Sequence, residues 1–82
     1  RRDEKIMHAA AFRETVGHAL EEEISRLPYS YLRMLLRRTY MAGDLLKLPS
    51  HLSDTEIQKV SGVGKKSFAY FRDIFPAPQD SE

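Results

Sequence analysis

The chain has 82 residues, no cysteine and a formal net charge of +1. A chain of this length forms one small domain, and without cysteine it can form neither disulfides nor thiolate metal sites. No segment reaches the roughly 18 consecutive apolar residues of a membrane span, and the charged N-terminus lacks the apolar core of a signal peptide. We therefore expect a soluble intracellular protein of the cytoplasm or nucleoid, or of the nucleus in a eukaryote. The start at Arg1 is also compatible with a fragment of a longer protein.

The small net charge conceals an uneven distribution. Residues 1–26 carry a charge of −1, residues 27–75 carry +4 and residues 76–82 carry −2. A basic central segment favours a polyanionic partner, although an ordinary solvated surface explains it equally well.

The spacing of apolar residues predicts an all-α fold, a compact bundle of about five helices, because no segment shows the alternation of a strand. A long N-terminal helix is expected over residues 3–26. Its apolar residues recur every three or four positions and form one stripe: Ala9, Phe12, Val16, Leu20, Ile24 and Leu27. Pro28 ends this run, and a second helix is expected over 29–38 with Leu32, Leu35 and Leu36 facing inward. Gly43-Asp44 then predicts a short helical turn over 43–48, closed by Pro49.

The clearest helix start is at Ser53, where Ser53 and Glu56 have the spacing of a capping box. Leu52 and Ile57 occupy the positions of a hydrophobic staple. This helix is expected to end near Val60, and a fifth is expected from Lys65 to about Phe75. The predicted organisation is thus a long N-terminal helix (1–26) for packing, oligomerisation or a junction, a domain over 27–75, and a flexible tail over 76–82.

The segment between the last two helices carries the chemistry. Gly62 and Gly64 permit a tight turn, and the aliphatic residue between them is expected to plug the core. The amides at the following helix start favour an anion, to which the side chains of Lys65, Lys66 and Ser67 can add contacts. Such contacts bind a phosphate backbone without reading a base.

This pattern is the helix-hairpin-helix signature, and residues 27–75 resemble the C-terminal domain of the bacterial RNA polymerase α subunit. Residues 64–67 match the family's Gly-Lys-Lys-Ser run, Phe68 stands where the family has a large apolar residue, and residues 43–45 match its Gly-Asp-Leu segment. The resemblance covers about 60% of the chain. It implies minor-groove DNA binding and contacts with transcription activators.

The chain departs from that family in the helix before Gly43. There the family supplies an arginine and an asparagine to DNA, whereas the alignment places Ser30 and Arg33. One residue is also deleted, so that Arg33, Arg37 or Arg38 of the same helix are the candidates to replace the missing arginine. We expect a relative of this fold and not the polymerase subunit itself.

Other motifs give little support for catalysis. A P-loop needs glycine five residues before its Gly-Lys pair, where this chain has Lys59. His8, His18 and His51 lack metal-ligand spacing, and the acidic run 21–23 is typical of a solvated helix face. Tyrosines in so small a domain more often cover the core, and only Tyr70 is near enough to the basic turn to be a candidate.

The sequence therefore predicts a non-catalytic module that binds duplex DNA, without cofactor, metal, membrane or small-molecule substrate. The predicted nucleic-acid-binding residues are Gly62, Gly64, Lys65, Lys66, Ser67, Arg33, Arg37 and Tyr70. A second hypothesis stays open, in which the hairpin is only structural and the domain binds a protein partner or itself through the N-terminal helix.

Overall fold

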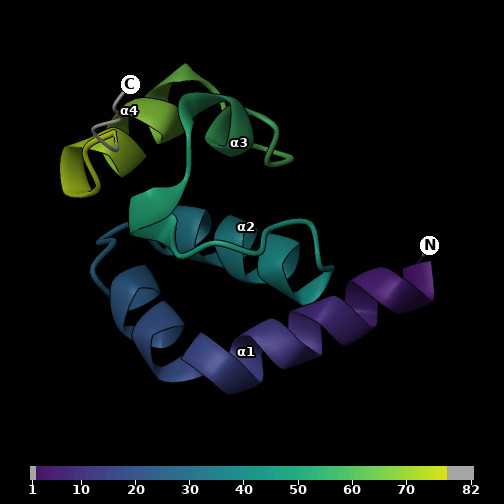
Figure 1. Cartoon of the computed structure of the whole chain (residues 1–82). Helices are drawn as coiled ribbons and strands as arrows, with labels where there is room; N and C mark the ends of the chain where they lie inside the picture. The colour runs from purple at the N-terminus through teal and green to yellow at the C-terminus, as the bar shows by residue number, and fades with distance from the viewer. Residues whose placement is uncertain (1, 78–82) are drawn as a thin grey trace.

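The computed structural model describes residues 2–77, apart from the side chain of Arg2, and within them the fold is all-helical, as predicted. The helices are α1 (Arg2–Ser25), α2 (Ser30–Met41), the short 3-10 helix η1 (Pro49–His51), α3 (Asp54–Gln58) and α4 (Lys65–Ile74) (Figure 1). The sequence predicted the flexible tail over 76–82, of which residues 78–82 lie outside the described part. None of the described helices combines the length and the apolar character that crossing a bilayer requires.

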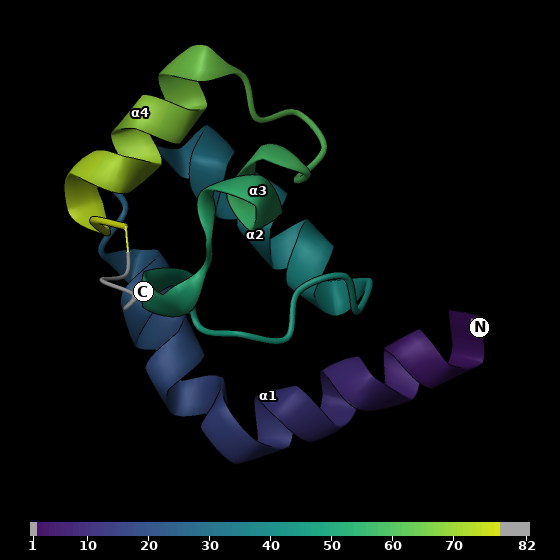
Figure 2. The same cartoon turned by 45° about the horizontal axis from the view of Figure 1, so that its top comes forward.

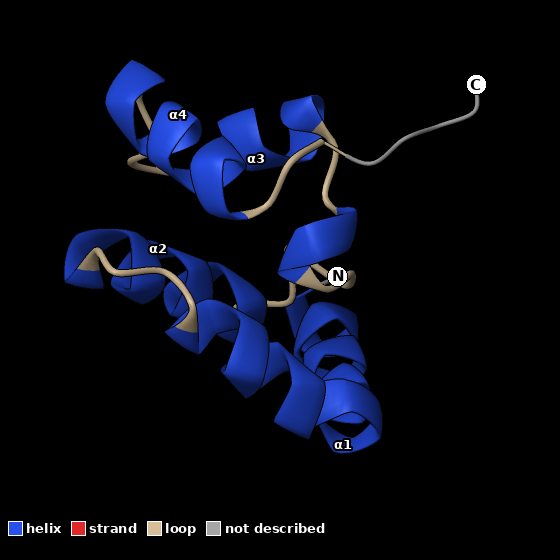
Figure 3. Ribbon diagram, turned by 90° about the vertical axis from the view of Figure 1, so that its left-hand side faces the viewer, coloured by secondary structure: helices blue, strands red, loops and turns tan. Residues whose placement is uncertain are grey.

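The helices pack around one core. α2 lies between α1 on one side and the pair α3 and α4 on the other (Figures 1 and 3). The core takes residues from every α-helix and from the connecting segments: Leu20, Ile24, Leu27, Leu32, Leu35, Leu36, Tyr40, Leu45, Leu52, Ile57, Val60, Phe71 and Phe75. The three leucines predicted to face inward from the second helix are thus all buried.

Helix α1 bends near its middle. Val16 has non-helical backbone angles, φ −129° and ψ 20°, and Gly17 follows it. The second half of the helix buries Leu20 and Ile24 in the core, as the predicted stripe requires. The first half begins at the periphery of the bundle and runs along its edge. Figure 2 shows both halves and the bend.

The predicted helical turn over 43–48 is wrong. Gly43 instead ends α2 with φ +83°: its amide donates to the carbonyl of Tyr40 over 3.1 Å, and the amide of Asp44 donates to that of Thr39 over 3.1 Å. These two bonds are those of a Schellman motif, which stops a helix and turns the chain away. The chain then runs without helix until Pro49, whose fixed φ suits the first position of η1.

Gly43 also permits a close contact with α1. A Cβ at this position would lie 2.3 Å from the backbone oxygen of Lys5, so only glycine fits. Beside it, Lys5 Nζ lies 2.8 Å from Asp44 Oδ1. This contact fixes the first half of α1 against the end of α2.

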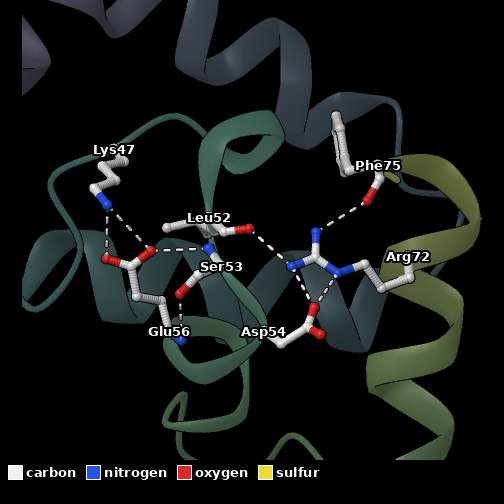
Figure 4. Close-up of polar contacts among 7 residues, drawn as sticks. All are labelled: Lys47, Leu52, Ser53, Asp54, Glu56, Arg72 and Phe75. Atoms are coloured by element: carbon white, nitrogen blue, oxygen red, sulfur yellow. Dashed lines mark hydrogen bonds and ion pairs between the residues drawn. The ribbon is translucent and has the colours of Figure 1, made fainter. Parts of the chain in front are cut away.

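The capping box at the start of α3 is confirmed. Ser53 Oγ accepts from the amide of Glu56 over 3.2 Å, and Glu56 Oε1 accepts from the amide of Ser53 over 2.8 Å (Figure 4). Leu52 and Ile57 are both fully buried on either side of the cap. The helix itself ends at Gln58, two residues before the predicted end.

Candidate nucleic-acid interface

The turn between α3 and α4, residues 59–64, is held against α2 by Gly62. This glycine has φ +95°, in the left-handed region that other residues rarely adopt. A Cβ on it would lie 2.9 Å from Leu35 Cδ2 and 3.2 Å from the hydroxyl of Tyr31. Glycine is therefore required at position 62 because the turn packs closely on α2.

Gly64 has a different environment. Its backbone, φ −103° and ψ −163°, is extended and open to any residue, and a Cβ built on it would meet no atom within 4 Å. Beside it lies an open hollow of about 260 Å³ lined by Gln58, Val63, Gly64, Lys65 and Phe68. Of the two glycines expected to permit the tight turn, only Gly62 has a positive φ, and Gly64 leaves free space at the surface.

The start of α4 presents uncompensated positive charge. Gly64 is the N-cap and supplies no side-chain acceptor, and the first turn contains no acidic residue. Lys65 and Lys66 are exposed, Ser67 is half-buried, and neither lysine forms an ion pair within the described part of the chain. Together with the free amides and the positive end of the helix dipole, the two ammonium groups favour an anion here.

Arg33 and Arg37, which the sequence predicted as binding residues of the second helix, do not lie at this turn. Arg33 Nη1 donates to the backbone oxygen of Leu27, in the segment after α1. Arg37 Nη2 lies 3.1 Å from Glu21 Oε1 of α1. Arg37 therefore faces α1 and Arg33 faces the segment that follows it, because the opposite side of α2, with Leu35, meets Gly62.

Arg38 is the third of the arginines that the sequence offered as replacements for the missing one, and the final set of predicted binding residues leaves it out. It follows Tyr31 by seven residues and Leu35 by three, so it shares their side of the helix. Its side chain is exposed and forms no ion pair with a described residue. Its spacing from Tyr31 and Leu35 could have identified Arg38 in the sequence. That spacing becomes informative only once the structure shows that this side of α2 packs on the turn. Lys59 in the turn itself is likewise exposed and unpaired among the described residues, and no sequence pattern indicated a role for it.

Tyr70 lies on α4, one turn after Lys66, and stacks on another tyrosine. Its ring centroid is 4.3 Å from that of Tyr29, with 20° between the ring planes. Both side chains remain exposed, at 42% and 40%. Because four residues separate them, Tyr70 and Lys66 lie on the same face of α4.

The two helices flanking the turn are joined by Arg72. Its guanidinium donates to Asp54 Oδ1 over 2.9 Å, to the backbone oxygen of Leu52 over 2.8 Å and to that of Phe75 over 3.1 Å (Figure 4). Only 13% of its side chain is exposed. One side chain thus links the start of α3 to the end of α4 and fixes the angle at which the turn is presented.

Two shifted pKa values belong to the scaffold below the turn. The hydrogen bond from the Ser53 amide, with Lys47 nearby, lowers the pKa of Glu56 from its ordinary 4.5. Burial raises the pKa of the Tyr40 hydroxyl, which donates to the backbone oxygen of Lys47 over 2.6 Å. Both contacts hold the segment between α2 and α3 in place. The described residues contain no cluster of three or more His, Cys, Asp or Glu side chains placed to hold a metal ion.

Comparison with known proteins yields no match to a protein-family model, to a curated protein or to a solved structure.

Proposed function

We propose that the chain is a non-catalytic module that binds duplex DNA by holding its phosphate backbone at the turn between α3 and α4. The observation that carries this proposal is the start of α4, where three features coincide: a helix end without a side-chain cap, two lysines that pair with no described residue, and the empty space beside Gly64. A phosphate oxygen can approach the amides closely at this position because no side chain blocks it. In this proposal the turn acts as a helix-hairpin-helix.

The binding surface extends from the turn onto one side of α2. Arg38 and Lys59 supply further cations around Gly62, whereas Arg33 and Arg37 are occupied by contacts with α1 and its end. Contacts of this kind fix the position of a duplex without reading its bases. The module therefore binds DNA with little sequence preference, and specificity comes from elsewhere in the parent protein or from partners.

The resemblance to the C-terminal domain of the RNA polymerase α subunit supports the same proposal. Of the residues that carry it, Gly64, Lys65 and Lys66 are exposed at the open end of α4. The proposed role in transcription rests on this resemblance alone, because the geometry of the turn does not indicate it.

A chemical-shift titration with blunt duplex DNA at low salt tests the proposal. We expect the largest amide shifts at residues 62–67 and at Arg38, with small shifts at Glu21 and Arg37. Shifts centred on α1, or no shifts at all, would contradict it.

A second candidate function is protein binding through α1. Ile6 and Met7, on the first half of this helix, expose 51% and 67% of their surface at the edge of the bundle. Neighbouring exposed apolar side chains mark a contact surface when they belong to a contiguous apolar patch. Sedimentation separates the two functions: a monomer that binds duplex DNA supports the first, and a stable oligomer that does not bind DNA supports the second.

A further inference from the structure

Tyr29 and Tyr70 form an exposed aromatic pair that the core does not require. Tyr29 is the extended N-cap residue of α2, with φ −106° and ψ 110°, and Tyr70 is on the outer face of α4. The two rings stack on each other through one face, and about two fifths of the surface of each residue stays exposed. Neither hydroxyl has a hydrogen-bond partner among the described residues.

The charges on α4 define what can lie against this pair. Lys66, Tyr70 and Asp73 are spaced by four and three residues and therefore share one exposed face. Lys66 attracts a phosphate, whereas Asp73 repels one at the next turn of the helix. Tyr70, between them, can therefore stack on an uncharged aromatic group when that group is attached to a phosphate bound by Lys66.

A nucleic-acid base is such a group when it is free to stack. Bases inside a continuous duplex are covered on both faces by their neighbours, whereas an unpaired base offers its faces to an aromatic side chain. Stacking on tyrosine tolerates any base because every base has a π-face.

We propose that Tyr70, supported by Tyr29, stacks on an unpaired base next to the phosphate held at the turn between α3 and α4. This inference rests on the proposed function. The preferred ligand is then a junction between duplex and single-stranded DNA, bound more tightly than a blunt duplex of the same sequence.

The test compares fluorescence-anisotropy titrations of a blunt duplex and of the same duplex with a short single-stranded extension. We expect the extension to tighten binding about 5- to 150-fold, the range that ~1–3 kcal/mol per stacked base corresponds to. Tyr70→Leu should abolish this gain, whatever its effect on the blunt duplex, whereas Tyr70→Phe should retain the gain. Urea unfolding of each variant verifies that it is folded.

The outcomes separate this inference from the proposed function. Equal affinity for both DNAs would overturn the inference and make the tyrosine pair a structural clasp between α2 and α4, while the proposed function would stand. A Tyr70→Leu variant that weakens both DNAs equally would also overturn it, because its effect would then not depend on the unpaired base. No binding to either DNA would overturn both proposals.

Discussion

Arg72 and Asp54 join α4 to the start of α3, with the guanidinium Nε 2.9 Å and Nη2 2.8 Å from the same carboxylate oxygen. The remaining donors of Arg72 reach two backbone carbonyls, at Leu52 and at Phe75. The side chain also lies 5.5 Å from the ring centroid of Phe71. A nearly buried cation with this many partners fixes the angle between α3 and α4 from behind the exposed turn that joins them.

Replacing Arg72 should therefore destabilise the domain. Arg72→Ala leaves two part-buried carbonyls without their donor, and we expect a loss of about 1–3 kcal/mol in the free energy of unfolding, measured with urea. Arg72→Lys should recover little of it, because one ammonium cannot span three acceptors. As a control, Arg37→Ala removes an exposed ion pair and should cost no more than about 1 kcal/mol. Equal effects of Arg72→Ala and Arg37→Ala would show that the link is unimportant.

The two glycines of the turn should respond differently to alanine. Gly62→Ala combines a positive φ with contacts to Leu35 and Tyr31, and should cost about 1–3 kcal/mol of stability. Gly64→Ala meets no atom and should leave the unfolding midpoint nearly unchanged, but it should weaken duplex binding because the methyl group enters the space of the phosphate. If folded Gly64→Ala protein binds duplex DNA as well as the parent, the phosphate does not approach this backbone.

Removing both lysines at the start of α4 should weaken binding in a salt-dependent way. For the Lys65→Ala, Lys66→Ala double variant, the plot of log affinity against log salt concentration should become shallower by about 0.9 for each phosphate that the protein no longer neutralises. The reduction in affinity should be similar for different DNA sequences. A matched control is the Lys5→Ala, Lys47→Ala variant, which removes the same charge from two ion pairs away from the turn. Equal reductions in the two double variants would indicate that only net charge matters.

Replacing the arginines of α2 should affect duplex affinity differently, depending on the side of the helix on which each lies. Arg38→Ala should reduce duplex affinity, because Arg38 is on the side of α2 that packs on the turn. Arg37→Ala should leave it nearly unchanged, because Arg37 is paired with Glu21 of α1. Both changes remove one positive charge, so the anisotropy titration compares position alone. The reverse order would mean that the DNA lies across α1 and α2.

The capping box should make stability sensitive to acid. The pKa of Glu56 is lowered in the folded state, chiefly by the Ser53 amide, so its contribution to stability is present above about pH 4.5 and is lost as pH falls through the folded-state value. Glu56→Gln keeps an acceptor for the same amide but does not titrate. The urea midpoint of this variant should therefore fall less than that of the parent on going from neutral pH to below 4.5. Identical pH dependence in the two proteins would exclude this role for Glu56.

Local features were predictable from the sequence because their energies arise within a few neighbouring residues. The capping box needs only Ser53 and Glu56 at the right spacing, and Pro28 ends the first helix wherever it packs. The buried row of Leu32, Leu35 and Leu36 likewise follows from helical periodicity. The segment over 43–48 was mispredicted because its leucines suit a helical turn, whereas Gly43 in a left-handed conformation ends α2 and lets α1 approach it closely.

The tertiary structure decided which charged groups are free to bind a ligand. The sequence contains three arginines in α2, and its periodicity alone does not say which side meets α1 and which meets the turn. Packing of Leu35 on Gly62 sets that rotation, and it assigns Arg33 and Arg37 to contacts with α1 and its end while leaving Arg38 exposed. The same long-range packing brings Tyr29 onto Tyr70 and Arg72 onto Asp54, because residues far apart in the chain meet only when the helices bury their apolar faces in a common core.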